Sequence, residues 1–252
     1  HNLGGIYEML GDDQKAMDFL AQALSIYMGV YGENHSSTAS TYDQIGQIYY
    51  KHKMYDNAES FMEKSLNIRR LCLGECHDEV AISYNNLALL YQAKENYVAA
   101  EEMFIKAMEI HKSLLGPDHP SVATIMTNLG GLYQKRKQYD EALEYMVPAL
   151  KIVEDAYSDD HPTVVLYRYG LALLYYEAGE FGKALPYLKN VYYDSLEKTG
   201  PEDRRTTYYH NFLNQLYFNI MREEDYDGSL DEDFHSFNRN TIVTASVVDD
   251  SQ

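Results

Sequence analysis

The sequence predicts an all-α fold, a right-handed superhelical solenoid in which similar helical hairpins stack on one another. Two observations lead to this prediction. A leucine or isoleucine recurs every 42 residues, and a tyrosine follows it four positions later at the same interval. Since this register continues over most of the 252 residues, the chain is a repeat protein. The apolar register positions are Leu3, Ile45, Leu87, Leu129, Leu171 and Leu213, and the tyrosines are Tyr7, Tyr49, Tyr91, Tyr133, Tyr175 and Tyr217.

Each unit is predicted to contain two antiparallel helices. In the first helix the apolar residue and the tyrosine lie at i and i+4, on one face, and a small residue between them allows a second helix to approach closely. Alanines in the second half of the unit, such as Ala58 and Ala100, mark the second helix. The segment "LGPDHPSVA" ends one unit with Gly116 and begins the next with Pro120 in its first turn. Such a hairpin must stack on its neighbours to bury its apolar face.

The stretch that begins at Tyr84, "YNNLALLYQAKENYVAAEEMFIKAMEIHKSLLGPDHPSVA", carries the family pattern most clearly. It resembles the tetratricopeptide repeat, in the 42-residue form found in kinesin light chains. The resemblance covers residues 1 to about 200 and implies a cargo adaptor that joins kinesin heavy chain through a coiled coil preceding these repeats. Other peptide-binding adaptors and bacterial proteins use the same form. Two units replace the "NNLA" phrase with "DQIG" and "RYGLA", which leaves the cargo open.

Three segments are expected along the chain. Residues 1–200 contain five repeats, the first truncated at its start because His1 already belongs to a first helix, as in a piece of a longer protein. Residues 201–222 form a capping helix, because Asn214 fills the small position. Residues 223–252 form an acidic flexible tail. Two alternatives remain for its aromatic residues Phe234 and Phe237: they dock in the groove as an autoinhibitory peptide, or the tail is a solvated extension.

Composition excludes several classes of function. A net charge of −18 argues against a nucleic-acid surface, and no apolar run is long enough to span a bilayer. Two cysteines favour a reducing compartment, so a cytoplasmic location is expected. The register histidines lie one repeat apart, and Cys72, Cys76 and His77 lack a paired C-x-x-C and a fourth ligand. We therefore predict a protein with no enzymatic activity, cofactor or metal.

The first helix of each hairpin is predicted to line the concave side of the solenoid, and its side chains there are rich in amides. An amide offers two donors and an acceptor, so it can bind the backbone of an extended peptide. Basic turns, such as Lys135–Lys137, would form a rim that attracts an acidic peptide. The alternatives are solvated amides and ordinary lysines at helix C-termini. The predicted peptide-binding residues are Gln44, Gln47, Lys51, Asn85, Asn86, Leu89, Gln92, Asn128, Gln134 and Lys135.

The sequence thus predicts a non-enzymatic adaptor that binds a short acidic segment of a protein partner in its concave groove. Two other functions remain open. The chain is a scaffold or self-association module that uses its convex face, or it is the sensor region of a larger signalling protein.

Overall fold

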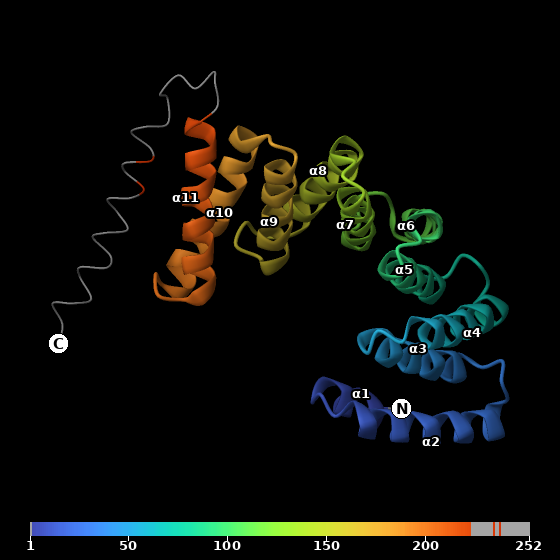
Figure 1. Ribbon diagram of the computed structural model, residues 1–252. Coiled ribbons are helices and arrows are strands. Elements are labelled where there is room, and N and C mark those ends of the chain that lie inside the picture. The colour runs from blue at the N-terminus through green and yellow to red at the C-terminus, as the bar shows by residue number, and fades with distance from the viewer. Residues whose placement is uncertain (1, 223–233, 235–236, 238–252) are drawn as a thin grey trace, which may run out of the picture. The chain divides into compact units, whose positions relative to one another are not determined.

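The structure, a computed structural model, describes residues 2–222 together with Phe234 and Phe237. Regular structure in residues 2–222 is entirely α-helical (Figure 1). Within each of two compact units, consecutive helices pack against one another. The prediction of an all-α repeat fold is therefore confirmed. The helices are α1 (Asn2–Met9), α2 (Asp13–Tyr31), α3 (Ser36–Lys51), α4 (Tyr55–Leu73), α5 (Asp78–Ala93), α6 (Tyr97–Leu115), α7 (Pro120–Lys135), α8 (Tyr139–Ala156), α9 (Pro162–Glu177), α10 (Phe181–Thr199) and α11 (Arg204–Met221).

The chain divides into two compact units, His1–Arg136 and Lys137–Gln252. In the first unit each helix from α1 to α6 packs on the next one along the chain, so that the series ends with α6 on α7. In the second unit α8 packs on α9, α9 on α10 and α10 on α11. Nearest-neighbour packing of this kind is typical of a repeat array, in which each repeat contacts only the repeats next to it.

The turn inside each hairpin depends on one residue with a positive φ angle. These residues are spaced by 42, and three of them are not glycine: Lys53, Glu95 and Lys137, with φ between 58° and 60°. The left-handed conformation costs a residue with a Cβ about 1 kcal/mol, which Gly11 and Gly179 avoid in the first and fifth turns. The turn geometry therefore repeats even where the residue type does not.

The four register histidines begin helices. In His35, His77, His119 and His161 the ring Nδ1 accepts a hydrogen bond from the backbone N–H two residues later, at 3.1–3.2 Å. These residues are the N-caps of α3, α5, α7 and α9, where a side-chain acceptor satisfies a backbone donor that has no partner within the helix. The histidines thus have a structural role. Asp203 caps α11 in the same way.

The small register positions mark close contacts between the two helices of a hairpin. A Cβ added to Gly4 would lie 2.7 Å from Cγ of Leu20, and one added to Gly46 would lie 2.7 Å from Cγ of Met62. Opposite them, Ala16 and Ala58 have no exposed surface. The close approach that the small residues predict is therefore present in α1–α2 and α3–α4.

The segment boundaries read from the sequence remain a proposal: repeats in residues 1–200, a capping helix in 201–222 and an acidic tail in 223–252. Apart from Phe234 and Phe237, the proposed tail lies outside the described residues. Helix α11 ends at Met221, one residue before the proposed end of the cap.

Candidate functional site: two faces of first helices

The ten predicted binding residues all belong to the first unit and come from three first helices. All are exposed or half-buried, as a binding surface requires. They are Gln44, Gln47 and Lys51 on α3, Asn85, Asn86, Leu89 and Gln92 on α5, and Asn128, Gln134 and Lys135 on α7.

Amide side chains connect the three first helices. Asn128 of α7 donates through Nδ2 to Oδ1 of Asn85 on α5, at 2.9 Å. Asn86 of α5 lies across from Asp43 of α3, with Nδ2 3.4 Å from Oδ1, and Gln47 donates to the other oxygen of Asp43 at 2.7 Å. Each bond uses one of an amide's several hydrogen-bonding positions, so the remaining ones can serve a ligand. We call this surface the amide face.

Asp43, whose carboxylate accepts the bonds from Asn86 and Gln47, is itself buried. Only 6% of Asp43 is exposed, and Arg69 of α4, also 6% exposed, lies 3.8 Å from it. Arg69 further donates to Ser83 and Glu79 of α5, at 2.5 and 3.1 Å. Asp43 is thus part of a buried polar network that joins two repeats and is not available to a ligand.

The basic turns are largely engaged in ion pairs with the preceding hairpin. Lys51 lies 2.8 Å from Asp13, Lys94 lies 2.8 Å from Asp56, and Arg136 lies 3.1 Å from Glu101. The hydrogen bonds from Lys51 and Lys94 lower the pKa of the Asp13 and Asp56 carboxyls. These cations therefore connect successive repeats, and their attraction for an acidic ligand is reduced by the acids beside them.

The second unit has a different face on its own first helices, α9 and α11. A hollow of about 340 Å³ is lined by Leu166 and Tyr169 of α9, Lys198 of α10, and Arg205 and Tyr209 of α11, among others. Another of about 360 Å³ is lined by residues that include Tyr176 of α9 and Tyr208 and Phe212 of α11. A third hollow shares Tyr169 and Tyr208 with them, so the three adjoin. We call this surface the tyrosine face.

Hydrogen bonds fix the rings of the tyrosine face. The hydroxyls of Tyr169 and Tyr208 are 3.0 Å apart, and Gln215 donates to the hydroxyl of Tyr176 at 2.8 Å. Burial raises the pKa of the Tyr169 and Tyr209 hydroxyls above the ordinary tyrosine value. Leu166 and Tyr208 are 64% and 52% exposed. The face therefore offers ordered aromatic walls and exposed apolar surface to a ligand.

The tyrosine face was not among the sites predicted from the sequence, although the repeat register contains a signal for it. The predicted peptide-binding residues all lie on α3, α5 and α7. Leu166 and Tyr169 stand in α9 where Ser40 and Asp43 stand in α3, and Tyr208 and Phe212 occupy such positions in α11. Phe212, for example, holds in α11 the register position that Gln44, a predicted binding residue, holds in α3.

Neither metal binding nor membrane crossing finds support in the described residues. Among residues 2–222, Phe234 and Phe237, no group of three or more His, Cys, Asp and Glu side chains is placed to hold a metal ion. No helix within this part of the chain is both long and apolar enough to cross a bilayer. Cys72 and Cys76 are exposed and free.

The hairpin packing, the register and the faces of the first helices define a helical-hairpin repeat protein. The family is shown by sequence: the tetratricopeptide repeat model matches residues 1–70, 79–146 and 122–192. The chain belongs to the tetratricopeptide repeat family. The resemblance to this family seen in the sequence is thus confirmed. A comparison with curated proteins finds no significant match.

Solved structures with the same fold include proteins of the kinesin light chain type. The putative kinesin light chain repeats of Podosopora anserina are 24% identical with a TM-score of 0.67, covering 79% of this chain and 94% of that one. BtubC (BKLC) from P. vanneervenii is 25% identical with a TM-score of 0.70, covering 81% and 82%. The apo form of RapI is 18% identical with a TM-score of 0.71, covering 97% and 83%.

Proposed function

We propose that this chain is a non-enzymatic adaptor that binds a short acidic segment of a protein partner on the faces of its first helices. Membership of the tetratricopeptide repeat family supports a role in protein–protein interaction. The proposal that a short peptide binds to the first helices is supported mainly by the adjoining hollows on α9 and α11. Hollows of a few hundred Å³ with aromatic walls and a few polar groups are typical ligand sites.

The tyrosine face suits a peptide with one large apolar residue and neighbouring carboxylates. An apolar side chain can enter the hollow beside Leu166 and Tyr169. Arg205 lines the same hollow and is largely exposed, and its Nε lies 4.0 Å from Oδ1 of Asp203. A guanidinium can bind a carboxylate through two parallel hydrogen bonds. Asp194 also lines this hollow, but Lys198 pairs with it at 2.7 Å.

The amide face of the first unit suits the backbone of an extended peptide. Asn85, Asn86 and Asn128 present donors and acceptors from two neighbouring helices. Such contacts are insensitive to the peptide's sequence, whereas Lys51 and Lys135 would favour acidic residues. The ten residues named above for this face are proposed as its binding residues.

A still narrower form of the proposal is a kinesin light chain-like cargo adaptor in the cytoplasm. It rests on the likeness to structures described as kinesin light chain repeats, and on the free cysteines expected in a reducing compartment. In this form, kinesin heavy chain would be a second partner, bound through a region preceding these repeats.

The test is an array of 12-residue peptides in which one Leu, Phe, Tyr or Trp is flanked by Asp and Glu, with neutral and basic versions as controls. The tightest peptide is then titrated against variants of the full chain. We expect Leu166→Ala with Arg205→Ala, or Asn86→Ala with Asn128→Ala, to weaken binding at least about tenfold, as the loss of two contacts implies. Lys51→Glu with Lys135→Glu should also weaken peptide binding, and this loss of affinity should become smaller as the salt concentration rises.

The matched control is Leu71→Ala on α4, a second helix whose leucine is 74% exposed. It should leave peptide affinity unchanged. Normal binding by the first-helix variants, with loss of binding in Leu71→Ala, would instead favour a scaffold that uses its outer surface.

A further inference from the structure

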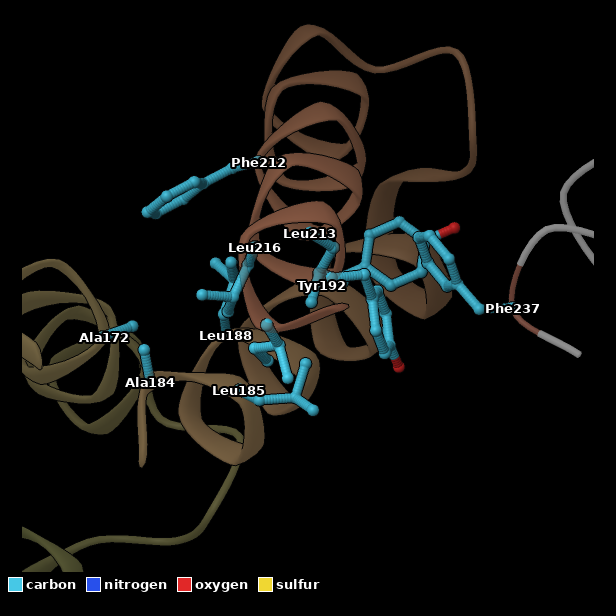
Figure 2. Close-up of a cluster of buried hydrophobic side chains, with 11 residues drawn as sticks. Ala172, Ala184, Leu185, Leu188, Tyr192, Phe212, Leu213, Leu216 and Phe237 are labelled. Carbon is cyan, nitrogen blue, oxygen red and sulfur yellow. The ribbon is translucent and has the colours of Figure 1, made fainter. Parts of the chain in front are cut away.

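Five aromatic rings gather at the C-terminal end of the second unit, and two of them come from the acidic stretch that follows α11. Phe237 is only 2% exposed. Its ring centroid lies 4.8 Å from His210, 5.4 Å from Tyr192 and 5.6 Å from Tyr217 (Figure 2 labels Tyr192 and Phe237). Phe234 adds a second ring, 5.3 Å from Tyr217. Phe237 is therefore buried, although the acidic composition of the stretch that contains it predicts exposure to solvent.

Complete hairpins contain ring contacts that resemble those of Phe237. In the second repeat Phe61, on the second helix α4, contacts Tyr42 and Tyr49 of α3 at 5.9 and 5.5 Å. In the first repeat Phe19 stacks on Tyr7 at 5.3 Å, and in the fifth Tyr187 stacks on Tyr175 at 5.9 Å. In these three repeats an aromatic side chain of the second helix thus covers the register tyrosine of the first helix.

His210 and Tyr217 hold the same register positions in α11 that Tyr42 and Tyr49 hold in α3. Phe237 contacts both of them, just as Phe61 contacts both tyrosines of its own repeat. The 42-residue register would place this aromatic at residue 229, where the chain has a serine. Phe237 therefore makes the contact of a second helix from a position outside the register.

We infer that the surface formed by Tyr192, His210 and Tyr217 is a binding site for a Phe-x-x-Phe segment, and that Phe234 and Phe237 of the same chain occupy it. We call this surface the aromatic seat. Two phenylalanines three residues apart lie on the same side of a helical turn, so one turn presents both rings together. Both described residues of the segment have helical backbone.

The aromatic seat is separate from the tyrosine face. Phe212, which lines a hollow of the tyrosine face, contacts Tyr176 of α9 at 5.0 Å. Figure 2 shows Phe212 projecting from α11 away from the side where Phe237 lies. Phe234 and Phe237 thus contact α10 and α11. They do not lie in the groove, where the autoinhibitory hypothesis placed them. The inference does not rest on the proposed function.

The seat can be tested by competition between the chain's own segment and the same segment supplied as a peptide. Fluorescein-labelled peptide of residues 230–240 is titrated against the full chain, Phe234→Ala with Phe237→Ala, and the control Phe218→Ala. Phe218 is on α11 but is 57% exposed. A tethered segment has an effective concentration on the order of millimolar, so a peptide of about 0.1 mM affinity should bind the double variant roughly tenfold more tightly than the other two.

A peptide in which both phenylalanines are alanine should bind none of the three proteins. Equal affinity of the labelled peptide for wild type and the double variant would overturn the inference, as would loss of its binding in Leu166→Ala. If the double variant fails to fold, a nuclear Overhauser contact between Phe237 and Tyr217 in the wild-type chain decides the question. Its absence would overturn the assignment. A wild-type dimer that the double variant converts to monomer would place a second copy's segment on the seat and also overturn it.

Discussion

Arg69 of α4 lies 3.8 Å from Asp43 of α3, and both residues are almost completely buried. Arg69 also reaches Glu79 and Ser83 of α5, so one guanidinium links three helices from two repeats. A buried charge left without its partner is costly, whereas a complete, hydrogen-bonded network is tolerated. The junction between the second and third repeats therefore depends on this arginine.

Replacing Arg69 with methionine should lower the free energy of unfolding by about 3 kcal/mol, because Asp43 would keep a buried charge without a cation. Denaturant unfolding measures the change. The neighbouring Arg70→Met is the control, since its partner Glu75 and Arg70 itself are about half exposed. It should cost less than about 1 kcal/mol. Asp43→Asn in the Arg69→Met background should recover part of the loss, and no recovery would contradict the account.

Replacing His119 with alanine should cost about 1 kcal/mol, because the N–H of Ser121 would lose the acceptor that caps α7. His119→Asp should retain the wild-type stability, since Asp203 caps α11 by accepting from the backbone N–H two residues later, as His119 does in α7. Thermal unfolding of the two variants compares them directly. Equal melting temperatures for His119→Ala and His119→Asp would contradict the role of His119 as the N-cap of α7.

The second unit should lose stability in acid through His210. Burial lowers the pKa of His210 below its usual value near 6.5. The unfolded chain then takes up the proton at a higher pH than the folded chain, so this stabilisation is complete above about pH 6.5 and declines as pH falls below it. Tyr42 and Tyr84 hold the same register position in α3 and α5 that His210 holds in α11. His210→Tyr should therefore fit this position and reduce the difference in unfolding free energy between pH 7.5 and 5.5. An unchanged difference would exclude His210 as the cause.

The sequence predicted the repeated parts of the fold well, because each repeat presents the same local contacts at the same register. The apolar position, the tyrosine and the small residue of each first helix were enough to predict the hairpins. The contacts between repeats were less accessible. Burial of Asp43 depends on Arg69, and the engagement of Lys51 depends on Asp13 of the preceding hairpin.

The candidate sites show the same limit. Amide residues of α5 and α7 could be placed on a shared face by periodicity, and the structure brings Asn85 and Asn128 together. The seat of Phe237 could not be predicted, because this residue lies outside the 42-residue register and its position depends on the rings of α10 and α11. Only three-dimensional packing relates it to Phe61.

Hydrogen–deuterium exchange of the full chain, with and without the tightest acidic peptide from the array, tests the proposed function most directly. Backbone amides exchange more slowly where a ligand stabilises local structure. The account predicts slowed exchange in first helices, in α9 and α11 or in α5 and α7, and little change in the second helices α4 and α6. Slowed exchange confined to second helices, or an array in which no acidic peptide binds more tightly than its basic counterpart, would contradict it.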